Sequence, residues 1–450
     1  MARRTRYAQV GLGGRHGMFR DAVLHTFSET SELVALCDRN EGRLRLSREE
    51  VRARGTEVPG YAAADFDRMI AETHPDWVIV TTKDRHHDEY ICRAMELGCH
   101  AITEKPMTID AARCQRILDT VKRTGRKLRV TFNYRYSPPR TQMKDLLMSG
   151  VIGEVLSADF HWLLDTHHGA DYFRRWHRNK ENSGGLLVHK ATHHFDLINW
   201  WLGTVPESVF AVGHRRFYRP ETAVRYGLTR RGERCHGCPE SARCPFYLDL
   251  AGNEGLRRLY LDCEKYDGYL RDQCVFSDRI GIEDSVSLAA CYENGVKMSY
   301  SLNACCAWEG YVVCINGSKG RIEHKCEEGA YINADGTVPG ALKAEGTWIR
   351  IYPIRKPAYE VEVWTAAGGH GGGDEPMLWD LFQPEPTADR YLRAADQRAG
   401  AWSILTGVAA NVSMAEGRAV RVRDLVGGLE RPDYPPMPTG NEPLGEAVRA

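Results

Sequence analysis

The chain has 450 residues, in which 60 lysines and arginines balance 60 aspartates and glutamates, and 42% of the residues are hydrophobic. This length predicts two or three domains, and the composition is typical of a soluble globular protein. Zero net charge argues against a nucleic-acid or anionic-membrane partner, because either would require a cationic excess. No apolar run approaches the roughly 18 residues of a membrane span, and no hydrophobic signal segment follows Met1. We therefore expect a cytoplasmic protein without a membrane partner.

The first 135 residues alternate short buried strands with segments of helical length. The strands are expected around Val10 and at 33–36, 77–80, 100–102 and 128–130, and helices at 88–97 and 109–124. Strands that alternate with helices predict a parallel, doubly wound sheet. The predicted fold class is thus α/β for this part, with a Rossmann domain at residues 1–135.

The pattern changes after Pro138-Pro139. A helix is expected at 140–149, and longer alternating strands at 155–162, 285–292, 296–302 and 311–316. The turn Glu293-Asn294-Gly295 suits a hairpin, which predicts an α+β domain with a large open, mostly antiparallel sheet. We place this domain at 136–427, with a cysteine-rich insertion at 218–280, an alanine-rich helical segment at 388–417 and an extended tail at 428–450.

A glycine-rich turn follows the first predicted strand. It contains Gly11, Gly13 and Gly14, followed by Arg15 and by His16 in the place of a third glycine. Glycines in such a turn let backbone N–H groups and a helix N-terminus approach a pyrophosphate. We therefore predict that this segment binds a dinucleotide.

The next predicted strand ends in Asp38, where a ribose-binding carboxylate is expected. A carboxylate that accepts hydrogen bonds from the ribose hydroxyls would repel a 2′-phosphate, which favours NAD over NADP. The neighbouring Arg39 can stack on adenine or reach a phosphate, so NADP stays open as the alternative.

Four further segments carry a resemblance to a known family. They are Glu104-Lys105-Pro106, 81–86, 133–138 and 149–154. Together with the glycine turn they resemble the Gfo/Idh/MocA family of NAD(P)-dependent sugar and polyol oxidoreductases, strongly over residues 6–200 and more loosely to about 425. The resemblance implies a Rossmann domain and a sheet domain often used for assembly, and hence a homodimer or homotetramer. The insertion at 218–280 is not part of the common family plan.

The resemblance also implies roles for particular residues. It adds Thr81, Thr82, His86 and Glu104 to the cofactor contacts, and it places Lys105 beside both the nicotinamide ribose and the reacting hydroxyl. A cation there hydrogen-bonds the substrate oxygen and stabilises alkoxide character as the hydride leaves.

The family's second catalytic element is Asp-x-x-x-His-x-x-Asp on a helix after two glycines. This chain has Gly184-Gly185 followed by His189, His193 and Asp196, so a histidine replaces the first aspartate. Spacing of four residues aims both imidazoles at one face of a helix. We predict that His193 is the base and that His189 takes part in catalysis, although the replacement removes the charge that would hold an imidazolium.

Polar and aromatic side chains nearby suit a polyhydroxylated substrate, which needs hydrogen bonds and a ring to pack on its sugar face. The predicted substrate contacts are Tyr134, Tyr172, Trp176, His177, Lys190, Asp196 and His370. A catalytic metal bound by these histidines is the less favoured hypothesis, because no HExxH pattern accompanies them.

The insertion contains five closely spaced cysteines. Cys235, Cys238 and Cys244 form the core of the set, Cys263 is the predicted fourth ligand, and Cys274 is the alternative fourth ligand. Such spacing suits a structural Zn²⁺ that stabilises a segment too small for its own core. An iron–sulfur cluster, a disulfide and unbound thiols are the alternatives.

The predicted function is an NAD-dependent dehydrogenase acting on a hydroxyl of a sugar, glycoside or polyol, with a small carbohydrate as the partner molecule. The alternative is an NAD-dependent glycosidase that oxidises C3 transiently, eliminates the aglycone, adds water and reduces C3 again. Thr192-His193 and the stretch 369–374 resemble segments of such glycosidases, but Lys190-Ala191 replaces their Tyr-Pro. A non-catalytic NAD sensor is the third alternative; it would not need Lys105 and His193 together.

Overall fold

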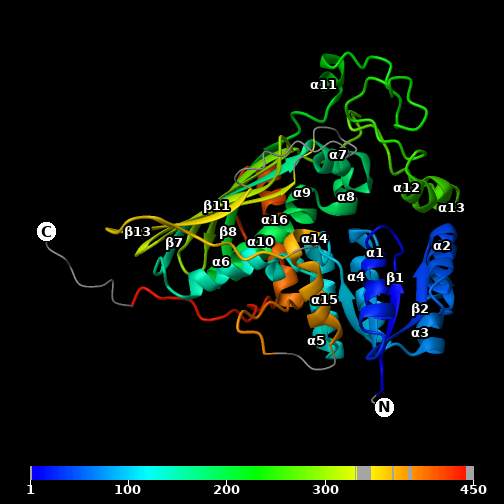
Figure 1. Cartoon of the computed structure of the whole chain (residues 1–450), viewed down its shortest axis with the longest axis horizontal. Coiled ribbons are helices and arrows are strands. Elements are labelled where there is room, and N and C mark those ends of the chain that lie inside the picture. Colours follow the sequence, from blue (N-terminus) through cyan, green and yellow to red (C-terminus); the bar gives the residue numbers. More distant parts are fainter. Residues whose placement is uncertain (1–2, 330, 332–345, 367–368, 384–387, 442–450) are drawn as a thin grey trace.

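Two β-sheets organise the chain in this computed structural model (Figure 1), which describes residues 3–329, 331, 346–366, 369–383 and 388–441. The first sheet has six strands and the second has nine. Both expected fold classes are confirmed: a parallel Rossmann sheet, followed by a mixed sheet that is mostly antiparallel.

The six strands of the first sheet run in parallel in the order β3-β2-β1-β4-β5-β6. The strands are β1 (Thr5–Val10), β2 (Ser31–Asp38), β3 (Gly60–Ala62), β4 (Trp77–Val80), β5 (His100–Thr103) and β6 (Leu128–Val130). The α-helices between them are α1 (His16–Asp21), α2 (Glu41–Arg52), α3 (Phe66–Thr73), α4 (His87–Glu96) and α5 (Ala111–Thr124). Because helices cover both faces of the sheet, central strands such as β4 are almost entirely apolar.

The nine-stranded sheet has the order β14-β13-β12-β11-β7-β10-β9-β8-β15, and only the β7–β10 pair is parallel among the described strands. The strands are β7 (Val155–Asp165), β8 (Pro206–His214), β9 (Ser285–Tyr292), β10 (Lys297–Cys306), β11 (Glu309–Gly317), β12 (Gly320–Gly329), β13 (Thr347–Pro353), β14 (Tyr359–Val361) and β15 (Val420–Arg421). Exposure alternates along β10, so one face of the sheet is buried and the other is open.

Helices cover the buried face of this sheet and connect it to the Rossmann domain (Figure 1). They include α6 (Pro138–Met148), α7 (Thr166–Arg174), α8 (Lys180–Ser183), α9 (Leu186–His189), α10 (Ala191–Leu202), α14 (Gly369–Gly372), α15 (Asp374–Phe382) and α16 (Gln397–Glu416). Every residue of α10 is buried, which shows that this helix lies inside the domain core.

The insertion forms the connection between β8 and β9, which are antiparallel neighbours. It contains α11 (Pro220–Arg225), α12 (Glu254–Leu259) and α13 (Glu264–Asp267). Figure 1 shows that α12 and α13 reach across to lie beside α2 of the Rossmann domain.

One predicted segment differs from the structure. The alanine-rich helix begins at Gln397 rather than at 388, because the Asp396 side chain accepts hydrogen bonds from the backbone N–H groups of Arg398 and Ala399 and so caps the helix there. Residues 429–439 contain no helix or strand, and residues 442–450 of the predicted tail lie outside the described residues. None of the helices that the structure describes is long and apolar enough to cross a membrane.

Candidate functional site

A cavity of about 570 Å³ opens where β1, β4 and β5 end, between the two sheets. Ligands of doubly wound folds bind at this edge of the sheet. Most of the predicted site residues line it: Gly11, Gly13, Gly14, Arg15, Asp38, Arg39, Thr81, Thr82, His86, Glu104, Lys105, Tyr172, Trp176, His177, His189, Lys190, His193 and His370. The structure thus brings the predicted cofactor and catalytic residues into one cavity.

The glycine turn shapes the dinucleotide end of the cavity. Gly11 has a φ of +88°, and a Cβ there would lie 2.6 Å from the backbone of Thr81 and Thr82, so glycine is required. The Asp38 carboxylate accepts hydrogen bonds from the backbone N–H groups of Leu12 (2.5 Å) and Asn40 (2.6 Å). These bonds fix Asp38 at the cavity wall, and a Cβ on Gly13 would meet no atom within 4 Å, so the turn is open to the cavity at this residue.

His16 is placed differently from the prediction. Its ring lies behind the turn, with Nδ1 2.6 Å from the carbonyl oxygen of Gly13 and Nε2 3.0 Å from the hydroxyl of Ser47, and it does not line the cavity. The side chain therefore supports the glycine turn rather than contacting a dinucleotide.

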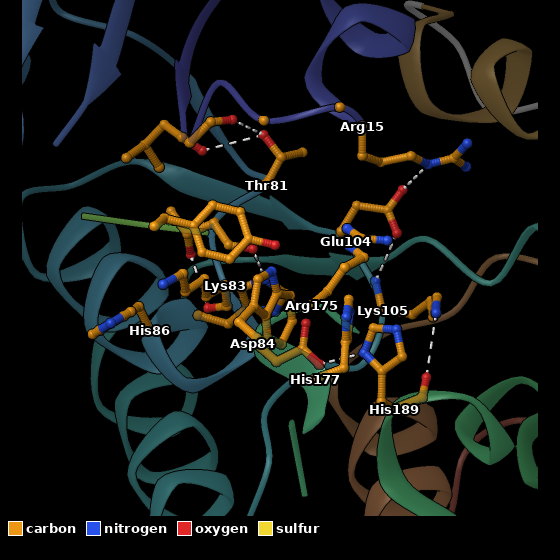
Figure 2. Close-up of a pocket in the computed structure, with 18 of the residues that line it drawn as sticks. Arg15, Thr81, Lys83, Asp84, His86, Glu104, Lys105, Arg175, His177 and His189 are labelled. Atoms are coloured by element: carbon orange, nitrogen blue, oxygen red, sulfur yellow. Dashed lines mark hydrogen bonds and ion pairs between the residues drawn. The ribbon is translucent and has the colours of Figure 1, made fainter. Parts of the chain in front are cut away.

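Lys105 lies at the other end of the cavity, where the Rossmann domain meets α9. Its Nζ donates a hydrogen bond to the carbonyl oxygen of His189 at 3.2 Å, as Figure 2 shows, and the Lys105–Pro106 peptide bond is cis. Burial lowers the pKa of Lys105 to about 8, although the carboxylates of Glu104 and Asp84 oppose this shift. The ammonium group is therefore close to its titration range at neutral pH.

His193 lies in the same part of the cavity. Its ring stacks on Tyr134, with centroids 4.2 Å apart, and its buried Nδ1 has no hydrogen-bond partner in the described part of the chain. Burial, and then the cations of Lys105 and Lys190, lower the pKa of His193 well below its usual value. The imidazole is thus neutral at pH 7 and able to accept a proton. Tyr134 does not line the cavity but orients His193 from behind.

His189 has a carboxylate partner that the sequence analysis did not identify. The Asp84 carboxylate, from the Rossmann domain, lies 2.5 Å from Nδ1 of His189 (Figure 2). Burial raises the pKa of Asp84 and lowers that of His189, so both shifts favour the uncharged forms. The expected single helix is interrupted at Lys190, between α9 and α10, yet both histidines still face the cavity.

A second carboxylate was also missed, because Glu309 belongs to β11, far along the chain. It binds His168 Nδ1 at 2.7 Å and lies 3.4 Å from Lys190 Nζ, while the Tyr172 hydroxyl lies 2.9 Å from His168 Nε2. Burial alone would raise the pKa of Glu309, but His168 and Lys190 hold it at about 2. This network fixes three polar side chains along the cavity wall.

Asp374 joins the two domains beside the cavity. Its carboxylate accepts hydrogen bonds from Arg15 at 3.1 Å and from Asn133 at 2.6 Å, and it lies 3.0 Å from His370 Nδ1. Arg15 also binds Glu104 at 2.6 Å. These contacts place His370 at the cavity, with its ring centroid 6.2 Å from that of His193.

Asp196 does not contact the cavity, so its predicted role as a substrate contact is corrected here. It pairs with Arg135 through two hydrogen bonds of 2.6 and 2.7 Å, and both side chains are only 1% exposed. A buried pair with two aligned hydrogen bonds positions α10 against the junction between the domains.

The cysteines of the insertion separate into two places. One small cavity is lined by four cysteines, Cys235, Cys238, Cys244 and Cys274, whereas Cys263 lies against α2. The cysteine near the first three is therefore Cys274, the alternative, and not Cys263. In the described residues, no three or more histidine, cysteine or acidic side chains are arranged to hold a metal ion. The geometry thus does not support zinc, which stays a prediction.

Two family models match the chain. Residues 5–132 match the NAD-binding Rossmann fold of the oxidoreductase family, and residues 144–422 match its C-terminal α/β domain. The chain belongs to the Gfo/Idh/MocA oxidoreductase family.

Individual relatives agree with this family assignment. The "Putative oxidoreductase YteT" of Bacillus subtilis is 35% identical over 92% of this chain and 97% of its own length. The D-glucoside 3-dehydrogenase of Escherichia coli is 29% identical over 38% of this chain and 47% of its own. The crystal structure of the aldose-aldose oxidoreductase of Caulobacter crescentus has the same fold, with a TM-score of 0.60 at 18% identity, over 93% of this chain and all of that one.

Proposed function

We propose that this family member is an NAD-dependent dehydrogenase that oxidises a hydroxyl group of a sugar, glycoside or polyol. The observation that carries the proposal is that Lys105 and His193 line the same cavity as the glycine turn and Asp38. A dinucleotide bound at the turn and a hydroxyl bound between Lys105 and His193 would then share one enclosed space. The D-glucoside 3-dehydrogenase among the relatives makes a carbohydrate the favoured substrate class.

The residues divide the chemistry between them. When bound, the nicotinamide supplies the acceptor for the hydride. Neutral His193 accepts the proton of the substrate hydroxyl, and the Lys105 ammonium stabilises the negative charge that develops on the oxygen. The network of Glu309, His168 and Tyr172 orients other hydroxyls of the substrate.

NAD is the proposed cofactor rather than NADP. Asp38 is held at the cavity wall by two backbone N–H groups, and its carboxylate would repel a 2′-phosphate. Arg43 lies 3.7 Å from Asp38 but is already paired with Asp267, so its charge is not free to bind that phosphate.

The glycosidase remains the second candidate, since His370, in the stretch that resembles such enzymes, lies at the cavity beside His193 and is held there by Asp374. A panel of glycosides, free sugars and polyols incubated with NAD⁺ separates the candidates. We expect NADH absorbance to rise in step with oxidised product. Release of free sugar without net NADH would instead favour the glycosidase, and bound NAD without either product would favour the sensor.

We also propose that the protein is a cytoplasmic homo-oligomer that uses the open face of the nine-stranded sheet. Phe210 and Val212 on β8 are 44% and 54% exposed on this face, beside the exposed Ala289 of β9. Apolar side chains exposed together on a sheet face suit burial against a second copy. Light scattering in solution gives the mass of the assembly, and a monomer would contradict the proposal.

A further inference from the structure

The insertion contributes side chains directly to the dinucleotide end of the cavity. Tyr260, Asp267 and Tyr269 line the cavity together with the glycine turn. They belong to residues 254–269, called the strap below, which comprises α12, α13 and the residues that join and follow them. The strap thus covers the end of the cavity where we place the dinucleotide.

The strap is docked on the Rossmann domain by several specific contacts. Asn40 Nδ2 donates a hydrogen bond to the carbonyl oxygen of Cys263 at 3.0 Å, and Arg43 forms an ion pair with Asp267. A Cβ on Gly42 would lie 2.6 Å from the Tyr266 ring and 2.8 Å from Cys263 Sγ. The strap therefore packs on α2 at a distance that only glycine permits.

Residues of the insertion outside the strap connect it to the sheet domain and to the rest of the insertion. Arg271, just after the strap, binds the Asp171 carboxylate through two hydrogen bonds of 2.7 and 3.0 Å, and its guanidinium lies 5.6 Å from the centre of the Tyr260 ring. Arg234 binds Glu264 of α13 at 2.5 and 2.9 Å. The strap is thus anchored directly to α2 of the Rossmann domain and, through the neighbouring Arg271, to Asp171 of the sheet domain.

Two strap side chains contact groups that face the cavity, one on the glycine turn and one in the loop after β4. The Tyr260 hydroxyl accepts a hydrogen bond from the backbone N–H of Gly14 at 3.2 Å, and this N–H is one of those that a pyrophosphate would use. The Lys83 ammonium lies 4.9 Å from the centre of the Tyr269 ring. A phosphate group of a dinucleotide bound at this N–H would lie within reach of the Tyr260 hydroxyl, whose O–H can donate a hydrogen bond to a phosphate oxygen.

We propose that the strap retains the bound dinucleotide and makes its release the slow step of turnover. The proposal rests on the dinucleotide binding assumed in the proposed function, and it adds that Tyr260, Asp267 and Tyr269 hold the cofactor in place. Release requires the strap to leave both domains, so its contacts oppose dissociation without taking part in hydride transfer.

Stopped-flow kinetics tests this proposal in two ways. With saturating NAD⁺ and an active substrate, the wild-type protein should form about one NADH per site rapidly and then continue slowly, as release limits turnover. Displacement of bound NADH by excess NAD⁺ gives the release rate directly. Tyr260→Phe removes the O–H group that would donate to a phosphate, and Asp267→Asn weakens the ion pair with Arg43. Because each variant loses a hydrogen bond to a charged group, each should release NADH about tenfold faster or more.

Asp262→Asn is the matched control, because Asp262 lies in the same strap, pairs at 3.0 Å with Arg257 of the strap itself and does not line the cavity. It should leave the release rate unchanged. Release rates equal to wild type in both Tyr260→Phe and the Tyr260→Phe plus Asp267→Asn double variant would overturn the strap proposal. NADH that binds and leaves slowly without any sugar oxidation would contradict the dehydrogenase alone, and failure to bind any dinucleotide would contradict both.

Discussion

The two ends of the cavity are built in different ways. At the reaction end, His189 and His193 stand on α9 and α10, in the buried core of the sheet domain, and rings such as Tyr134 pack directly on them. At the dinucleotide end, the strap is a short irregular segment bound mainly by ion pairs and hydrogen bonds. The histidines proposed to act in catalysis are thus fixed mainly by packing, whereas the strap residues proposed to retain the dinucleotide are fixed by contacts that can break and form again. The two functions should therefore be separable by mutation.

The largest effect is expected at the reaction end. Loss of a general base costs about 10²–10⁴ in rate, so His193→Ala and Lys105→Ala should each slow hydride transfer by at least this lower bound. Single-turnover measurements with preloaded NAD⁺ should be used, because slow release would otherwise mask the change. The release rate of NADH should stay near the wild-type value. Exposed His161, on β7, provides the control His161→Ala, and near-normal hydride transfer in His193→Ala would contradict the assignment of the base.

The pH dependence of hydride transfer should separate the two catalytic groups. The pKa of His193 lies well below its usual value, so the rate should rise with pH only through the acidic range and then level off. It should fall as pH rises through about 8, where Lys105 loses the charge that stabilises the developing oxyanion. Each limb changes the rate about tenfold per pH unit. A rate that rises through pH 8 would show that Lys105 acts as the base instead.

The pairing of His189 with Asp84 should have an intermediate effect. Asp84→Asn replaces the carboxyl group that holds His189 Nδ1, which should slow hydride transfer by about tenfold to a hundredfold and shift the acidic limb of the pH profile. His189→Asp should also depress the rate, because it would place a second carboxylate next to Asp84. Wild-type activity and an unchanged pH profile in His189→Asp would show that His189 only packs at this position.

At the dinucleotide end, Asp38→Ala should narrow the preference for NAD over NADP by about tenfold or more. The reason is that the carboxylate no longer repels the 2′-phosphate. Calorimetry with both dinucleotides measures this change. Equal or tighter binding of NADP by the wild-type protein would contradict the role given to Asp38.

The smallest effect on catalysis is expected from changes to the cysteines of the insertion, which lie outside the cavity. If the zinc prediction is right, the purified protein contains about one Zn²⁺ per chain. Cys235→Ser plus Cys238→Ser should lose it, and Cys263→Ser should keep it, because Cys263 lies apart from the other four. Elemental analysis that finds no metal in the wild-type protein would reject zinc, and spectroscopy would reveal an iron–sulfur cluster.

The sequence was sufficient for features that depend on neighbouring residues. The glycine turn, Asp38, Lys105 and the two histidines of α9 and α10 could all be found, because each belongs to a short pattern tied to one turn or helix. Even the end of the β9–β10 hairpin was predictable, since Gly295 adopts the positive φ that its turn requires.

Pairings between distant segments were not predictable in this way. Asp84 and His189 are 105 residues apart, and Gly14 and Tyr260 are 246 apart, so no local pattern joins them. Asp196 shows the opposite error. Its spacing from His193 suggested a substrate contact, but Arg135 neutralises it in the core, and only the tertiary structure reveals that partner.

The position of the insertion between β8 and β9 has a consequence for the topology of the sheet. His214, at the end of β8, is paired with Ser285, at the start of β9, so the segment leaves and re-enters the sheet at the same point. A long excursion between adjacent ends costs little in chain entropy and leaves the strand register unchanged. A short turn in place of the segment would therefore keep the pairing of β8 with β9 and leave the dinucleotide end of the cavity open, but it would also remove Tyr218 and Phe276 from the hydrophobic core.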